Sequence, residues 1–133
     1  MKFTQFEPKY NHRYLVKFPI EFNFPEYAFI KVNKPKFTNG KWEPIQLVFV
    51  DPIAPSTSQC LFALLESIKD KKEQKILFSF SIQSLDPCGT VIEDWKIHVG
   101  QEVSIDFGNL DYSDESIQTP KMIVKPVYCV LNY

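Results

Sequence analysis

The chain has 133 residues, of which 44% are hydrophobic and 15% aromatic, and its formal net charge is −1. This length supports one hydrophobic core, so we expect a single domain over residues 1–133. The near-neutral charge excludes the basic surface of a dedicated nucleic-acid binder, and the sequence contains no run of about 18 apolar residues that could span a membrane.

The first third of the chain predicts short strands joined by stiff connections. Residues 12–18 and 27–32 are rich in aromatic and β-branched side chains, which favour strands, and Pro19 ends the first of them. Residues 33–40 predict a turn-rich loop. Residues 42–50 predict a third strand, in which three alternate side chains share one face: Ile45, Leu47 and Phe49.

The only helix that the sequence predicts covers residues 57–69. Ser56 followed by Gln59 matches a capping box at a helix start. Four apolar side chains then recur at helical spacing, and we expect them to pack against the body of the protein: Leu61, Leu64, Leu65 and Ile68.

The second half predicts longer strands with clear alternation. Residues 75–85 place Phe78, Phe80 and Ile82 on one face, and residues 86–89 form a Pro-Gly turn. Two further strands are expected, over residues 90–98 and 99–107, each with one apolar face: Val91, Glu93, Trp95 and Ile97 on the first, and Val103, Ile105 and Phe107 on the second. We expect Trp95 and Phe107 to face the core. Residues 118–133 predict either a strand pair or one strand bent at Pro126.

These elements predict a mainly β fold, an antiparallel β-sandwich or barrel of seven or eight strands with one flanking α-helix. The three isolated glycines of the second half, at positions 89, 100 and 108, are interpreted as turn glycines. The sequence contains no internal repeat and no domain boundary.

Catalytic and metal-binding patterns are missing from the sequence. The two histidines, His12 and His98, lie in predicted strands, and no nucleophile, phosphate-loop or Cys/His metal motif occurs. We therefore predict no enzyme, no cofactor and no metal. The acidic residues after position 105 form either a solvated turn or a charged contact loop, because the spacing of a calcium loop is lacking.

Two other groups of residues have ordinary interpretations. The aromatic residues Phe18, Phe22, Phe24 and Tyr27 could form a ligand platform, but core and connector packing is the simpler interpretation. The three cysteines are odd in number and far apart, and the first residues do not form a signal peptide. Both features predict reduced thiols in a product made in the cytoplasm.

Five segments, taken in order, resemble a known family. They are residues 6–14 (FEPKYNHRY), 51–56 (DPIAPS), 85–95 (LDPCGTVIEDW), 107–113 (FGNLDYS) and 129–131 (CVL). Together they resemble the tail tube proteins of long-tailed bacteriophages, which are related in fold to the tube protein of type VI secretion.

The resemblance implies a structural subunit of a virion tail that is assembled in the host cytoplasm. Subunits of this family form hexameric rings, and the rings stack into a hollow conduit through which DNA passes without specific binding. The implied partners are other copies of the chain, a sheath if the tail contracts, and the baseplate and tail terminator proteins. The loop between Asn33 and Trp42 is shorter than the stacking loop of larger tube proteins, so a baseplate-proximal or end-ring paralogue remains an alternative. A monomeric β-sandwich binding module is a further alternative, and a small enzyme is the weakest.

Three regions are the expected contacts between subunits: an N-terminal arm over residues 1–11, the 33–42 loop and the 108–115 loop. The arm carries aromatic residues without apolar periodicity, and the loops are charged. The candidate contact residues are Phe3, Phe6, Pro8 and Tyr10 in the arm, Lys36, Asn39 and Lys41 in the first loop, and Asn109, Asp111, Asp114 and Glu115 in the second.

Overall fold

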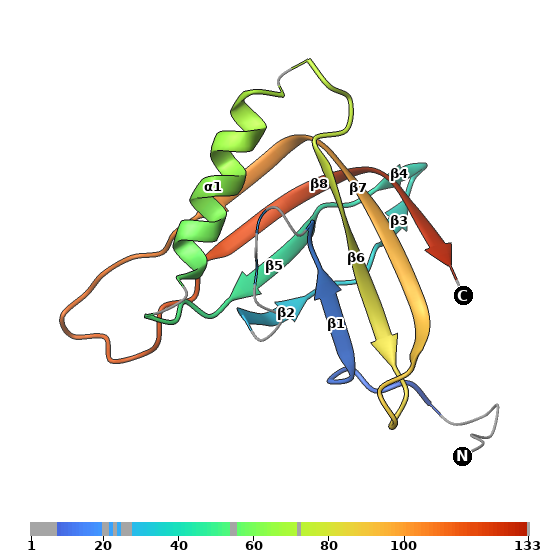
Figure 1. Ribbon diagram of the computed structural model, residues 1–133, viewed down its shortest axis with the longest axis horizontal. Helices are drawn as coiled ribbons and strands as arrows, with labels where there is room; N and C mark the ends of the chain where they lie inside the picture. The colour runs from blue at the N-terminus through green and yellow to red at the C-terminus, as the bar shows by residue number, and fades with distance from the viewer. Residues whose placement is uncertain are drawn as a thin grey trace.

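The computed structural model describes residues 8–19, 22, 24, 28–53, 56–71 and 73–132. Within these residues the protein is a six-stranded antiparallel sheet with one helix and a small separate hairpin (Figure 1). The strand order is β1-β6-β7-β8-β5-β2, so β1 and β2 are the two ends of the sheet. The strands are β1 (Tyr14–Lys17), β2 (Phe29–Val32), β5 (Ile45–Phe49), β6 (Phe78–Leu85), β7 (Val91–Asp106) and β8 (Lys121–Asn132).

The sheet curls until its two end strands approach each other, which gives a nearly closed barrel (Figure 1). Its inner face forms the core because alternate side chains of each strand point inward. The predicted faces of β5 and β6 are confirmed, and the most deeply buried strand residues include Ile45, Leu47, Phe49, Phe80, Ile82, Ile97, Val99, Met122 and Val124. The mainly β prediction with one flanking helix is therefore confirmed.

Aromatic residues from the connector before β2 fill one end of this core. The ring of Phe18 lies 4.9 Å from those of both Phe24 and Phe80, measured between centroids. Phe22 is buried. These contacts support core packing over a ligand platform for the aromatic residues, although Tyr27 lies outside the described residues.

Helix α1 spans Thr57–Lys69, the range that the sequence predicts. The hydroxyl of Ser56 accepts a hydrogen bond from the backbone N–H of Gln59 at 3.3 Å, which confirms the predicted cap. The helix inserts two of its four apolar side chains fully into the core, Leu61 and Leu64, and leaves the other two half-buried, Leu65 and Ile68.

Asp51, just before the helix, provides a second cap that the sequence did not predict. Its Oδ1 accepts hydrogen bonds from the backbone N–H groups of Thr57 at 3.0 Å and Ser58 at 3.3 Å. Burial alone would raise the pKa of Asp51, but hydrogen bonds from Ser58, Ser56 and Thr57 outweigh burial and hold the pKa below its ordinary value. The carboxylate thus remains charged at the positive end of the helix.

Replacing this cap should destabilise the fold. We expect Asp51→Ala to lower the free energy of unfolding by about 1–2 kcal/mol, the usual cost of losing an N-cap acceptor. Urea unfolding followed by circular dichroism measures the loss. Asp70→Ala, at the other end of the helix, is the matched control, and an equal loss in both variants would contradict the capping role.

Strand β7 is one continuous strand where the sequence predicted two. The register between β7 and β8 shifts between Val99 and Val103, so a bulge bends the strand at Gly100. A Cβ added at Gly100 would lie 2.9 Å from the Val127 side chain. The interpretation of Gly100 as a turn glycine is therefore wrong, whereas Gly89 and Gly108 do lie in turns and have φ values of 85° and 100°.

Three further predictions concern Phe107, Trp95 and the last strand. Phe107 lies beyond the end of β7 and is 39% exposed, so the prediction that it faces the core is wrong. Trp95 is half-buried and packs against the core as predicted. Strand β8 runs unbroken through Pro126, which selects the single-strand alternative.

The predicted 33–40 loop contains a hairpin. Its strands are β3 (Phe37–Thr38) and β4 (Lys41–Trp42). Asn39 and Gly40 form the turn with φ values of 53° and 78°, because an Asn-Gly pair tolerates the positive φ that a tight hairpin turn requires. This dipeptide was the signal that sequence reasoning missed.

Candidate assembly surfaces

The gap between the two end strands is a seam without a backbone ladder. Among the described residues, β1 pairs only with β6, and β2 pairs only with β5. Side chains bridge the gap instead: the Tyr14 hydroxyl donates to the Ile30 carbonyl at 2.9 Å, and the rings of Phe18 and Phe29 stack at 5.6 Å. Each end strand therefore keeps a row of backbone groups that no other described strand satisfies.

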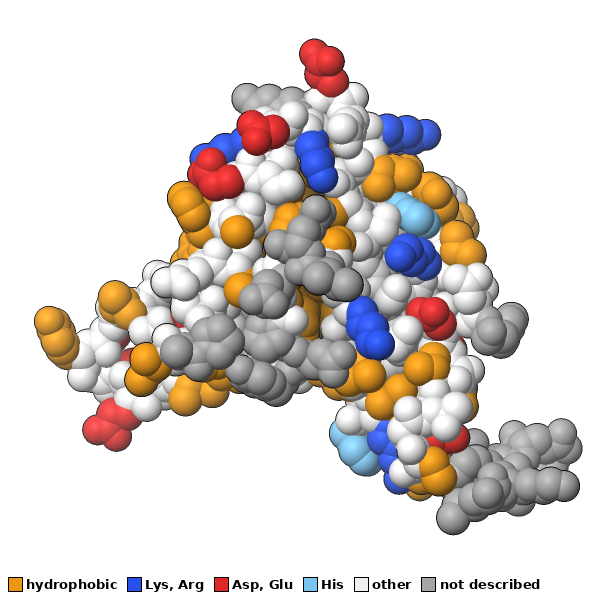
Figure 2. Space-filling view, in the orientation of Figure 1, with side chains coloured by type: hydrophobic (Ala, Val, Ile, Leu, Met, Phe, Trp, Pro, Cys, Tyr) orange, Lys and Arg blue, Asp and Glu red, His pale blue; other side chains and the backbone are white. Residues whose placement is uncertain are grey.

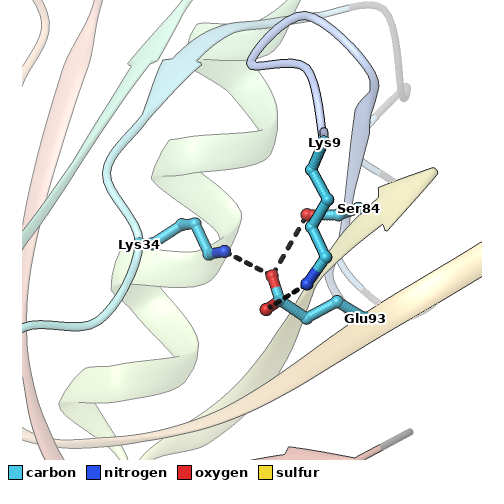
Figure 3. A network of polar contacts seen from close by, with 4 residues as sticks. All are labelled: Lys9, Lys34, Ser84 and Glu93. Atoms are coloured by element: carbon cyan, nitrogen blue, oxygen red, sulfur yellow. Dashed lines mark hydrogen bonds and ion pairs between the residues drawn. The ribbon is translucent and has the colours of Figure 1, made fainter. Parts of the chain in front are cut away.

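Glu93 of β7 makes ion pairs with the segments on both sides of this seam (Figure 3). One carboxylate oxygen accepts from the ammonium of Lys9 at 3.1 Å, in the segment before β1. The other accepts from Lys34, in the segment after β2, and from the hydroxyl of Ser84 at 3.3 Å. Glu93 thus ties the flanks of both end strands to the centre of the sheet.

The surroundings of Glu93 keep it ionised. Its side chain is only 10% exposed, whereas those of Lys9 and Lys34 are about half exposed. Burial alone would raise the pKa of Glu93, but hydrogen bonds and charge from Lys34 and Lys9 outweigh burial and lower the pKa below its ordinary value. Sequence reasoning placed Glu93 on the same face as Trp95 and Ile97, and a carboxylate on an apolar face was the available signal for a buried ion pair.

The acidic loop, defined here as residues 107–119, is shaped by its own side chains. Asp111 Oδ1 accepts from the backbone N–H and the hydroxyl of Ser113, at 2.9 and 2.8 Å. Asp114 Oδ1 accepts in the same way from Ser116, at 2.9 and 2.6 Å. These bonds lower the pKa values of both carboxyl groups. Two of the candidate contact residues are thereby also turn-forming residues.

The acidic loop projects from one end of the molecule and exposes apolar side chains (Figures 1 and 2). Leu110 is 85% exposed, and Tyr112 is fully exposed. The loop also encloses a hollow of about 600 Å³. A charged loop that leaves large apolar groups in water is typical of a surface that another molecule covers.

The other candidate contact residues lie elsewhere. Lys36, Asn39 and Lys41 are all exposed on the β3–β4 hairpin, at the opposite end of the molecule from the acidic loop (Figure 1). Phe37 in this hairpin is 59% exposed, and the ammonium of Lys36 lies 3.6 Å from Glu43.

The described part of the N-terminal arm also presents contact candidates to solvent. Pro8 and Tyr10 are exposed, and the Arg13 guanidinium lies 4.5 Å from the centre of the Tyr10 ring. Phe3 and Phe6 lie outside the described residues. Asn109 and Glu115 are exposed in the acidic loop. The structure thus separates the candidates into three surfaces rather than bringing them into one site.

One serine–histidine pair is the most enzyme-like arrangement in the described chain. Ser79 Oγ lies 2.7 Å from His98 Nδ1 across β6 and β7, and the His98 ring stacks on Tyr128 at 4.2 Å. Burial first, and then the charge of Lys96, lower the pKa of His98. Among the described residues no carboxylate is hydrogen-bonded to His98, so in this part of the chain the pair lacks the third group of a catalytic triad.

The described residues contain no group of three or more His, Cys, Asp or Glu side chains that could hold a metal ion. In the same part of the chain, no helix is both long and apolar enough to cross a membrane.

No family model matches the chain, and neither does any curated protein. Solved structures match it over nearly its full length. A chain from the sheath/tube terminator of PVC, an extracellular contractile injection system, is 14% identical, with a TM-score of 0.67 over 98% of this chain and 100% of that chain. A chain from the PVC sheath–tube complex is 15% identical, with a TM-score of 0.67 over 96% and 93%.

A chain from the tube-terminating cap of the anti-feeding prophage, AFP, extends the likeness. It is 12% identical, with a TM-score of 0.61 over 99% of this chain and 95% of that chain. At these identities the likeness shows a shared fold, and that fold recurs in different parts of contractile injection systems.

Proposed function

We propose that this chain is a structural subunit of a phage-type tail or contractile injection system, which acts by assembling with copies of itself. The observation that supports this most is the full-length match to components of such particles, since 98% of this chain superposes on 100% of a chain from a sheath/tube terminator structure.

In the finer form of the proposal, six copies make a ring and the rings stack into a hollow tube through which DNA passes. A sheath, the baseplate and the tail terminator proteins are its proposed partners, and the virion tail is its location. The strand edges at the seam, which no other described strand pairs, and the exposed acidic loop support self-association, because unpaired strand edges and exposed apolar groups favour contact with other chains.

A specialised ring at one end of the tube is the second candidate. Two observations favour it: the matching structures include a tube terminator and a tube-terminating cap, and the β3–β4 hairpin has only a two-residue turn. Gold-labelled antibody against the chain, imaged on tail particles that contain it, tests both candidates. Label along the whole tube supports the main tube subunit, and label at one end supports the end ring. If the chain occurred only as a free monomer and never in a tail particle, both candidates would be contradicted.

The acidic loop provides a variant that should separate folding from assembly. We expect the combined change Leu110→Ser and Tyr112→Ser to leave the unfolding free energy almost unchanged, because both side chains are exposed, but to reduce assembly severely. Asp111→Lys does not separate folding from assembly as well, because Asp111 also forms a turn within the loop. Sedimentation velocity measures assembly, and Phe62→Ser, an exposed position on α1, is the control. Normal assembly by the loop variant would remove this loop from the contact.

A further inference from the structure

A row of basic and hydroxyl side chains crosses the outer face of the sheet. Ser81 of β6 pairs in register with Lys17 of β1 on one side and with Lys96 of β7 on the other. Val16, the neighbour of Lys17, faces the core with Ile82, so the row Lys17–Ser81–Lys96 points outward. Two strand spacings separate the lysine Cα atoms, which puts them about 10 Å apart.

This row borders a hollow that apolar side chains also line. The hollow has a volume of about 480 Å³, and Lys71 and Ser79 complete its polar lining. Phe18, Leu77 and Phe78 supply apolar wall. Figure 2 shows several lysine or arginine side chains, set apart from one another, on the face of the molecule that carries β1 and β6. The basic hollow, as we name it, therefore offers both positive charge and apolar surface.

The charge in the basic hollow lacks an internal counterpart among the described residues. None of the ion pairs within 4 Å in that part of the chain involves Lys17, Lys71 or Lys96. Asp94, two residues before Lys96 on the same face, is the nearest carboxylate along the strand, and it does not balance three ammonium groups. Ammonium groups on one face repel one another, so an acidic partner would stabilise this arrangement.

We propose that the basic hollow of one subunit receives the acidic loop of a second copy of this chain. The loop supplies carboxylates at positions 111, 114 and 115, together with the exposed Leu110 and Tyr112. The hollow supplies lysines and an apolar wall, so charge and apolar character match on both sides. The β3–β4 hairpin is the poorer match, because Glu43 already lies beside Lys36.

This contact joins two different surfaces of the same chain, so it repeats head to tail and generates a ring or a filament. It rests on the proposed self-assembly and identifies the contacting surfaces.

A charge exchange tests the proposal on the full chain. Glu115 is the acidic position to reverse, because no hydrogen bond to its carboxylate occurs among the described contacts, whereas Asp111 and Asp114 form turns. We expect Lys96→Glu and Glu115→Lys each to raise the concentration needed for half-assembly by about tenfold or more, because reversal places like charges together. The combination of both changes in one chain should recover most of that loss.

Two further variants distinguish the loss of this contact from a general effect of charge and from misfolding. Lys125→Glu makes the same change in net charge at an exposed site outside both surfaces and should assemble normally. If Lys96→Glu fails to fold by circular dichroism, Lys96→Gln removes the charge alone and should still weaken assembly.

Normal assembly by both single variants, or no recovery in the combined variant, would overturn the loop-in-hollow contact while self-assembly stands. Loss of binding to a short DNA duplex by Lys96→Glu, with assembly unchanged, would reassign the hollow to phosphate and overturn the inference. A wild-type chain that never assembles would overturn both the inference and the proposed function.

Discussion

Phe80→Ala is expected to lower the free energy of unfolding by about 3–5 kcal/mol, the usual cost of truncating a buried phenylalanine. Phe80 is 1% exposed, and its ring stacks 4.9 Å from that of Phe18. The substitution leaves a cavity beside Phe18 and Phe78. A domain of this size has only about 5–15 kcal/mol of stability, so the loss should be plain in urea unfolding.

Phe107→Ala is the matched control for this experiment. The two changes remove the same atoms, but Phe107 is 39% exposed and lies beyond the end of β7. We expect a loss of less than about 1 kcal/mol for the monomer. Equal losses for the two variants would mean that the inner face of the sheet is assigned wrongly.

Glu93→Ala should have the second largest effect, because it removes the group that ties both flanks of the seam to β7. Lys9, Lys34 and Ser84 would each lose an acceptor. We expect a loss of about 1–3 kcal/mol, below that of a fully buried ion pair because the lysines are half exposed. Glu102→Ala, which removes an exposed pair with Lys125, is the control and should cost less than about 1 kcal/mol.

The contribution of Glu93 to the free energy of unfolding should also depend on pH. The direction of that dependence follows from the direction of its pKa shift. Its pKa is lower in the folded chain than the ordinary value of 4.5, so the folded state favours the charged form. This stability is fully present above pH 4.5 and is lost as the pH falls through the lower folded-state pKa. The difference in stability between wild type and Glu93→Gln should therefore shrink in acid. A constant difference from pH 7 to pH 3 would contradict the ionic role.

Local patterns were sufficient to predict the helix and the faces of β5 and β6, but not the β3–β4 hairpin or the continuity of β7. The alternation of Phe78, Phe80 and Ile82, and the capping box at Ser56, each depend on neighbours within a few residues. Phe107 shows the limit of such patterns. Its alternation with Val103 and Ile105 continues past Asp106, but the Asp106 side chain accepts a hydrogen bond from Gly108 and starts the turn there.

The candidate surfaces were predictable only as exposed loops. The link from Glu93 to Lys9 and Lys34 spans 84 and 59 residues of sequence. The row Lys17–Ser81–Lys96 depends on the register of three strands, two of which are far apart in the chain. The position of Glu93 on an apolar face was visible in the sequence, but its lysine partners and the row across the sheet depend on tertiary pairing, which leaves no periodic signal.

The central claim is that this chain acts by joining copies of itself, and its assembly state in solution tests that claim most directly. We predict that the purified full chain, concentrated stepwise and followed by sedimentation velocity with electron microscopy of the same samples, converts from monomers to closed rings or stacks of rings. A single monomeric species at every concentration, with no rings in the images, would contradict the account.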